Sequence, residues 1–179
     1  MKLKNGEEVW IREAEVSDTQ ALLDYMRALT YETEFLSFVP GEFNYTMASE
    51  EQWIKDHQNK AGNLILNAWV KEQLVANLSM GTPGRQKLDH WATLGISVRK
   101  AYWGLGLGNI LMQKAVDFAK QSGLYSLRLE VFSPNLRAIH LYEKFGFKQV
   151  GRFQNAGRLP DGRLMDDLFM ELIVNPDAI

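Results

Sequence analysis

Residues 95–120 read GISVRKAYWGLGLGNILMQKAVDFAK, and this stretch decides the fold. Its first part, with β-branched Ile96 and Val98, predicts a strand, and the apolar repeat after Gly108 predicts a long amphipathic helix. Alternate glycines, Gly104 to Gly108, stand where the helix begins. Glycine lets backbone N–H groups approach an anion without a Cβ in the way, and free N–H groups at a helix N-terminus attract negative charge. The loop is therefore a candidate diphosphate cradle, with an ordinary strand-to-helix turn as the alternative.

Two well-known nucleotide loops do not fit these residues. A Walker loop ends in Gly-Lys-Ser/Thr, whereas Asn109 follows Gly108. A dinucleotide fingerprint needs a third glycine at the position of Asn109. Both nucleotide readings therefore fail, and the loop is either a cradle for another anion or an ordinary strand-to-helix turn.

A second stretch, residues 127–152, reads LRLEVFSPNLRAIHLYEKFGFKQVGR and predicts a strand followed by a helix over 135–145. Asn135 and Tyr142 fall two helical turns apart, so they share one face of that helix. The small side chain of Ala138 lies between them and leaves room for a thin ligand. A core aromatic at helical spacing is the alternative reading of Tyr142.

Together the two stretches resemble the GNAT superfamily of N-acetyltransferases. The first resembles a motif with a strand ending in Val-Arg and then [RQ]-x-x-G-x-[GA], here Val98-Arg99 and residues 103–108. The second resembles Asn followed by A-x-x-L-Y-x-x-x-G-F, here Asn135 and residues 138–147. Trp103 departs from the Arg or Gln usual at its position. The YWGxGxG form also resembles the branch that acetylates ribosomal-protein N-termini and small amines.

The resemblance implies a mixed α/β (α+β) GNAT fold over residues 1–179 as a single N-acetyltransferase domain. Its central sheet would be mixed and mostly antiparallel, with about seven strands, a splayed parallel pair and about four helices packed on it. The resemblance implies acetyl-CoA as cosubstrate and no metal. It also implies the residues that contact CoA: Ile96, Ser97, Val98, Gly104, Leu105, Gly106, Leu107, Gly108, Asn109 and Asn135.

Acetyl transfer needs a group that protonates the departing thiolate and a route by which the attacking amine loses its proton. Tyr142, with an ordinary pKa near about 10, suits the general acid. Glu130 is the candidate base: its phase on the strand turns it away from Leu129 and Val131, and the resembling ribosomal-protein alanine acetyltransferases carry their base in the same L-E-V arrangement. The alternative reading of Glu130 is a surface glutamate on a strand. The alternative to any base is a desolvated site that lowers the pKa of the amine itself. The resemblance also implies that a backbone N–H near Val98 binds the acetyl oxygen.

The rest of the chain alternates strands and helices. Ser17 to Gln20 and Ser49 to Gln52 each have the form of a capping box, which predicts helices running to about Leu29 and through the fifties. The strands flanking the helix at 106–122 are expected to be parallel neighbours. The predicted strands are 9–14, 63–70, 74–82, 89–98, 126–132, 147–155 and 164–174.

Composition narrows the class of protein. The chain has 179 residues, a net charge of −2 and no cysteine, which excludes disulfides and thiolate nucleophiles. The charge gives no reason to expect nucleic acid. No secretory signal or apolar run of membrane-spanning length is evident, so a cytoplasmic location without membrane contact is the expectation.

The acceptor is left open by the sequence. Residues 31–47 are expected to line its site, where Glu32, Glu34 and Glu42 either attract a cation or are merely solvated. The first reading is an enzyme that acetylates a small amine, amino acid or polyamine. The second is an enzyme for a protein N-terminus of the ribosomal-protein type, and the third is a CoA-binding sensor without turnover. Monomer and homodimer are both compatible with the sequence.

Overall fold

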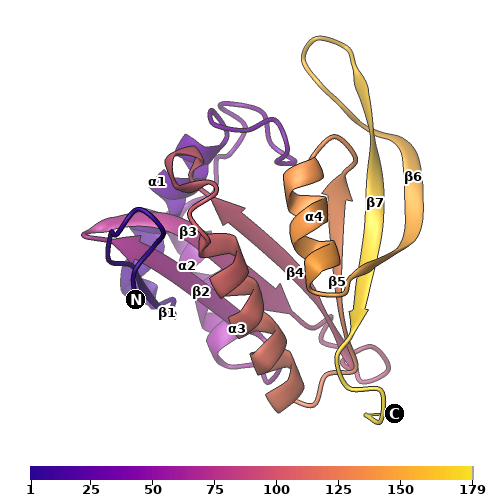
Figure 1. Cartoon of the computed structure of the whole chain (residues 1–179). Helices are drawn as coiled ribbons and strands as arrows, with labels where there is room; N and C mark the ends of the chain where they lie inside the picture. Colours follow the sequence, from indigo (N-terminus) through magenta and orange to yellow (C-terminus); the bar gives the residue numbers. More distant parts are fainter. Residues whose placement is uncertain (179) are drawn as a thin grey trace.

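The computed structural model describes residues 1–178 and contains one seven-stranded sheet in the order β1-β2-β3-β4-β5-β7-β6 (Figure 1). Only β4 and β5 are parallel, and all other neighbours are antiparallel. The strands are β1 Trp10–Glu13, β2 Leu64–Val70, β3 Gln73–Gly81, β4 Trp91–Val98, β5 Ser126–Phe132, β6 Lys148–Arg158 and β7 Leu164–Ile173. The four α-helices are α1 Thr19–Leu29, α2 Met47–Gln58, α3 Leu107–Gln121 and α4 Leu136–Lys144. The predicted fold class is confirmed.

The helices cover the sheet in two groups. Helix α3 buries its apolar stripe, with Leu111 and Met112 fully enclosed, and α4 buries Tyr142 in the same core. Helices α1 and α2 pack a second, smaller core on the other face, centred on Leu22 and Ile54. In Figure 1, α3 and α4 lie in front of the sheet and α1 and α2 behind it. The apolar spacing seen in the sequence therefore corresponds, in each helix, to one apolar stripe that is buried against the sheet.

The parallel pair of strands separates soon after it begins. β4 and β5 are paired only where Trp91 to Thr93 lie opposite Ser126 to Arg128. Beyond Thr93, β4 stays bonded to β3 as far as Val98, while its other edge has no partner strand within residues 1–178. The sheet therefore opens into a gap between β4 and β5, as expected for the splayed pair.

Both helix starts differ from the predicted capping boxes by a few residues. The backbone N–H of Glu15 donates to the Asp18 carboxylate, so the first cap lies earlier than Ser17. At α2, Thr46 and Ser49 cap each other, and the helix begins at Met47 rather than after Ser49. At α2 the upstream Thr46, whose backbone is extended, accepts the N–H of Ser49 and so caps that helix. At α1 the preceding residue, Asp18, has helical backbone geometry, and its carboxylate accepts the Glu15 N–H of the turn before the helix.

Candidate functional site

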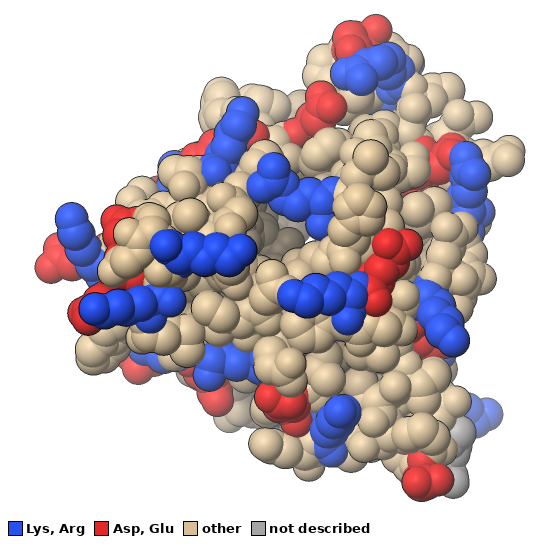
Figure 2. All heavy atoms as spheres, in the orientation of Figure 1, with Lys and Arg blue, Asp and Glu red and all other residues tan. Residues whose placement is uncertain are grey.

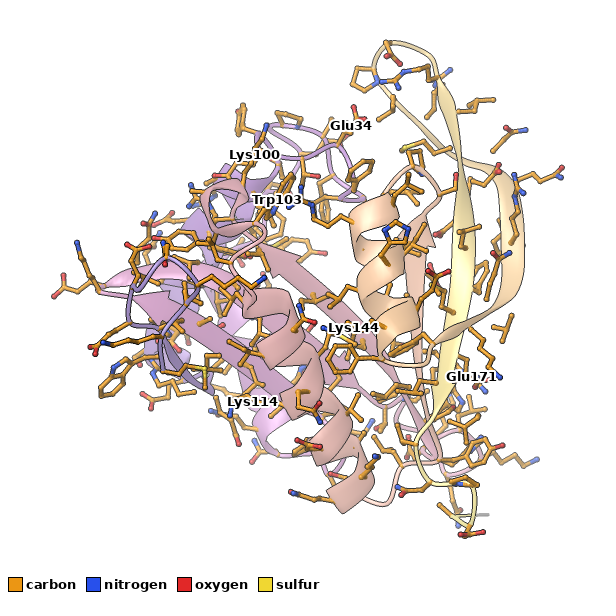
Figure 3. The ribbon with its side chains drawn as sticks, in the orientation of Figure 1. Glu34, Lys100, Trp103, Lys114, Lys144 and Glu171 are labelled. Atoms are coloured by element: carbon orange, nitrogen blue, oxygen red, sulfur yellow. The ribbon has the colours of Figure 1, made fainter. Side chains whose placement is uncertain are left out.

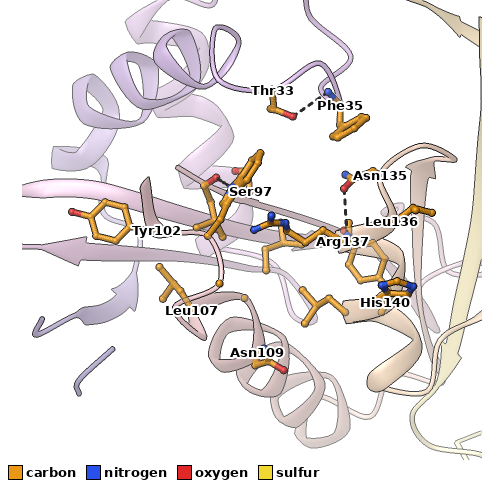
Figure 4. Close-up of a pocket in the computed structure, with 18 of the residues that line it drawn as sticks. Thr33, Phe35, Ser97, Tyr102, Leu107, Asn109, Asn135, Leu136, Arg137 and His140 are labelled. Carbon is orange, nitrogen blue, oxygen red and sulfur yellow. Dashed lines mark hydrogen bonds between the residues drawn. The ribbon is translucent and has the colours of Figure 1, made fainter. Parts of the chain in front are cut away.

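A cavity of about 850 Å³ lies where the sheet opens; we name it the glycine-loop cavity. Its walls come from the end of β4, the loop before α3, the first turns of α3 and one face of α4 (Figure 4). Of the predicted CoA-binding residues, all but Leu105 line it: Ile96, Ser97, Val98, Gly104, Gly106, Leu107, Gly108, Asn109 and Asn135. The predicted general acid, Tyr142, lines it too.

The glycine loop has the backbone geometry that the sequence suggests. Gly104 and Gly106 both have positive φ, 77° and 94°, which residues with a Cβ adopt at a cost. Gly106 is the N-cap of α3, and no side chain caps this helix. At Gly108 a Cβ would come within 3.1 Å of the Leu141 side chain, so glycine keeps α3 and α4 close there. The free N–H groups at the start of α3 therefore border the cavity without side-chain cover.

The free edge of β4 forms a second wall. Because Arg99 donates its backbone N–H to Val75 on β3, strand alternation turns the peptide groups of Val98 and Ile96 toward the gap. The carbonyl of Val98 accepts the indole N–H of Trp103 at 2.7 Å. The Arg137 guanidinium of α4 lies over the Trp103 ring, 4.5 Å from its centroid. In Figure 4, Arg137 extends from α4 across the cavity toward the strand that carries Ser97.

Helix α4 supplies the third wall. The Asn135 side chain accepts the backbone N–H of Ala138 at 3.3 Å, so it caps this helix. Tyr142, two turns on, is only 6% exposed, and burial raises its pKa to about 12. Among residues 1–178 its hydroxyl has no hydrogen-bond partner, yet it is not one of the fully buried unpaired polar atoms. The phenol is thus a neutral donor that reaches the cavity.

Cationic side chains surround this cavity, and the sequence did not identify them. Figure 2 shows Lys and Arg side chains gathered around a hollow in the front face. Lys4, Arg137 and Lys144 line it, and Lys144 donates to the Asn109 side chain across the gap between α4 and α3 (Figure 3). Lys114 and Arg99 do not line it. Lys4 comes from the N-terminal segment, which contacts the glycine loop. No local sequence pattern predicts this contact.

A second cavity of about 710 Å³ adjoins the first; we name it the hairpin cavity. Residues 30–40 form one side, and the end of the β6–β7 hairpin forms the other. The two cavities share Thr33, Phe35, Leu36 and Trp103 in their linings. Its walls are largely apolar, with three carboxylates: Glu32, Glu34 and Asp167. Glu42 does not line it, and its carboxylate instead accepts the backbone N–H of Val39.

The loop that carries Glu32 is tied to the end of β4. The Glu32 carboxylate accepts the Arg99 side chain at 2.6 Å and the backbone N–H of Lys100 at 2.7 Å. Both side chains of the Glu32–Arg99 pair are only 22% exposed. On the inner face of the same strand end, the Tyr25 hydroxyl donates to Ser97 at 2.9 Å. These bonds fix one wall of the hairpin cavity to the edge of the glycine-loop cavity.

Glu130 points out of the core, as its strand phase predicts: it is exposed while Leu129 and Val131 are buried. It lines neither cavity. Burial raises its pKa, and the neighbouring Asp167 carboxylate raises it further.

Among residues 1–178 no group of three or more His, Asp or Glu side chains is arranged to hold a metal ion. In the same range, no helix has the length and apolar character to span a membrane.

Comparison with known proteins shows which family the chain resembles in sequence and in structure. Residues 21–147 match the family model described as Acetyltransferase (GNAT) family. The chain is 43% identical over 56 residues to streptothricin acetyltransferase of Streptomyces lavendulae, covering 31% of this chain and 30% of that protein. It is 34% identical over 88 residues to the [Ribosomal protein bS18]-alanine N-acetyltransferase of Escherichia coli K12, covering 49% and 59%. The chain therefore spans between about a third and three fifths of these curated relatives.

Similarity in structure extends further along the chain. A GNAT-family acetyltransferase from Streptococcus pneumoniae superimposes with a TM-score of 0.89 at 27% identity, covering 94% of this chain and all of that one. The sequence resemblance drawn from the two motifs is thereby confirmed.

Proposed function

The chain belongs to the acetyltransferase (GNAT) family, and we propose that it transfers the acetyl group of acetyl-CoA to a primary amine. One observation carries the proposal: the free β4 edge lies between the glycine cradle and Tyr142, in a single cavity that joins the hairpin cavity. A long thin thioester and an amine can then approach each other from the two cavities. Residues 1–179 would form one catalytic domain, and we expect it to work in the cytoplasm.

In this proposal the glycine-loop cavity holds acetyl-CoA. The backbone N–H groups of residues 105–109, at the positive end of α3, bind its diphosphate. Lys4, Arg137 and Lys144 add positive charge around that anion. The free peptide groups of Ile96 and Val98 pair with the pantetheine arm, and the Val98 N–H stabilises the acetyl oxygen as negative charge develops on it. Asn135 contributes by fixing the first turn of α4.

The reaction requires one bond to form and one to break. The neutral amine nitrogen bonds to the thioester carbon, the C–S bond breaks with its electron pair going to sulfur, and the nitrogen gives up a proton. Tyr142 donates its phenolic proton to the departing sulfur and regains one from solvent. Its raised pKa keeps the phenol protonated at neutral pH. Glu130 is the proposed base, acting on the side of the amine.

The acceptor is proposed to be a small amine, amino acid or polyamine. The hairpin cavity, with apolar walls and three carboxylates, suits an amine that arrives as a cation. A second candidate is a protein N-terminus, because one relative is a ribosomal-protein alanine N-acetyltransferase. The turn of the β6–β7 hairpin, whose residues line this cavity, projects beyond the rest of the sheet at the top of Figure 1.

The decisive experiment measures CoA thiol release from acetyl-CoA with spermidine, L-lysine, glycinamide and an alanine-initiated tetrapeptide. We expect turnover with at least one acceptor and a mass gain of one acetyl group on it. The ratio of kcat/KM between small amines and the tetrapeptide decides between the two acceptor classes. Tight acetyl-CoA binding without thiol release from any acceptor would contradict the proposal and favour a CoA-binding sensor.

A further inference from the structure

Asp167 on β7 lies opposite Phe132 of β5, and Phe169 lies opposite Glu130. Cross-strand partners point to the same side of a sheet, and residues two apart on a strand do so as well. Glu130 and Asp167 are therefore diagonal neighbours on one face. Only Asp167 of the two lines the hairpin cavity. The candidate base from the sequence thus has a partner that stands between it and the space where an acceptor would bind.

The three carboxylates of the hairpin cavity differ in their ionic partners. Glu32 is paired with Arg99 at 2.6 Å, and Glu34 with Arg163 at 3.7 Å. Within residues 1–178, no Lys, Arg or His lies within ion-pair distance of Asp167. The two cations in the lining of the cavity, Lys100 and Arg158, do not form an ion pair with it. A partly buried carboxylate without a counter-charge is costly, and an ammonium group of a ligand would offset that cost.

From this geometry we propose that Asp167 is the carboxylate that binds the ammonium group of the acceptor and takes its first proton, sharing it with Glu130. The inference rests on the proposed acetyl transfer. The ammonium N–H bond breaks, its electron pair stays on nitrogen, and the proton passes to the Asp167–Glu130 pair. The freed lone pair then forms the bond to the thioester carbon, and the pair releases its proton to water through the exposed side of Glu130.

The pair has the electrostatic character that this step needs. Burial raises the pKa of Asp167, although hydrogen bonding with Glu130 opposes that rise. Burial and the adjacent negative charge raise the pKa of Glu130. Two carboxyl groups that interact in this way titrate as a unit, so the proton taken up by one is stabilised by the other. The acceptor class follows: a primary alkylammonium whose carbon chain lies against Phe38, Leu159 and Met165.

The test compares Asp167→Asn with Asp166→Asn. Asp166 is the neighbouring residue of the same type, but it pairs with Arg152 and lines neither cavity, so it controls for loss of a β7 carboxylate. The readout is kcat/KM against pH for spermidine and for glycinamide at saturating acetyl-CoA. In the wild type and in Asp166→Asn, we expect kcat/KM to rise with pH along an acidic limb. The midpoint of this limb should be the same for both amines, because the titrating group is the carboxyl pair of the enzyme.

In Asp167→Asn we expect kcat/KM to fall by about 100-fold or more, with the remaining limb following the pKa of each amine. The affinity for acetyl-CoA, measured by calorimetry, should stay within about twofold, since Asp167 does not line the glycine-loop cavity. If Asp167→Asn does not fold, Asp167→Ser provides the same test. Unchanged kcat/KM and an unchanged limb in a folded variant would overturn the inference while leaving acetyl transfer intact. A wild type that releases no CoA with any amine would overturn the proposed function, and this inference with it.

Discussion

The two cavities are built in different ways. The glycine-loop cavity is lined by backbone groups, by glycines and by helix residues at fixed spacing, and most of it comes from two contiguous stretches of chain. The hairpin cavity is assembled from residues 30–40, single positions on β5 and β7, and the end of a hairpin. Recognition by backbone demands particular sequences, because only glycine permits the required conformation and approach. Recognition by side chains from scattered loops leaves no comparable pattern, which explains why the donor can be inferred from sequence and the acceptor cannot.

The first prediction concerns the proposed general acid, which lines the glycine-loop cavity. Tyr142→Phe removes the phenolic proton and keeps the buried ring, so we expect turnover to fall by about 10²- to 10⁴-fold. Acetyl-CoA affinity should change little, because the hydroxyl is needed only when sulfur departs. Since the pKa of Tyr142 is about 12, the wild type should show no loss of rate from phenol ionisation up to about pH 10.

Steady-state kinetics and calorimetry check this prediction, with Tyr125→Phe as the control for loss of a tyrosine hydroxyl outside both cavities. Wild-type turnover in Tyr142→Phe would mean that water protonates the sulfur.

The second prediction tests recognition by backbone. Gly106 and Gly123 both have positive φ, 94° and 71°, and they flank opposite ends of α3. Valine at either position should cost similar stability, because a β-branched residue is strained there. Only Gly106→Val should also weaken acetyl-CoA binding, by about 100-fold, equivalent to about 2.7 kcal/mol. Thermal unfolding and calorimetric titration of the two variants separate the effects, and equal affinities would refute the cradle.

The third prediction tests recognition by side chains. Glu32→Gln weakens the contact that ties one wall of the hairpin cavity to Arg99 and Lys100. We expect the KM for the amine to rise by roughly tenfold, a loss typical of one charge-assisted hydrogen bond, with acetyl-CoA affinity nearly unchanged. Glu42→Gln, in the same loop but outside both cavities, is the matched control. A change confined to acetyl-CoA affinity would contradict the division between the cavities.

The smallest effect is expected at the rim of the glycine-loop cavity. Lys144→Gln removes one exposed cation near the proposed diphosphate site and should weaken acetyl-CoA binding by about fivefold at low salt. The difference should shrink as ionic strength rises, because salt screens exposed charges. Lys114→Gln, on the same side of the sheet but outside the cavity, should bind as the wild type does. Calorimetry in two salt concentrations measures both, and a salt-independent loss would indicate a packing effect.

Sequence reasoning found the fold and most of the glycine-loop cavity because local rules govern both. The glycine placement and the resemblance carried by the two motifs name Val98, Gly106 and Tyr142 without knowledge of distant contacts. The proposed role of Asp167 depends on the register between β5 and β7, which places it opposite Phe132. The position of Lys4 at the cavity depends on the packing of the N-terminal segment beside Gly106. Such neighbours are determined by tertiary contacts, so the periodicity of residues along the chain does not predict them.

The opening between β4 and β5 has a consequence for hydrogen exchange. A sheet normally protects the amides of its central strands, because exchange there requires the ladder to open. The N–H groups of Ile96 and Val98 face the gap where that ladder is missing, although they lie in the middle of the sheet. In the free protein they should exchange with solvent deuterium as fast as loop amides, while Ser97, bonded to β3, stays protected. Saturation with acetyl-CoA should slow the exchange of both, so that an alternating pattern of fast and slow amides becomes uniformly slow.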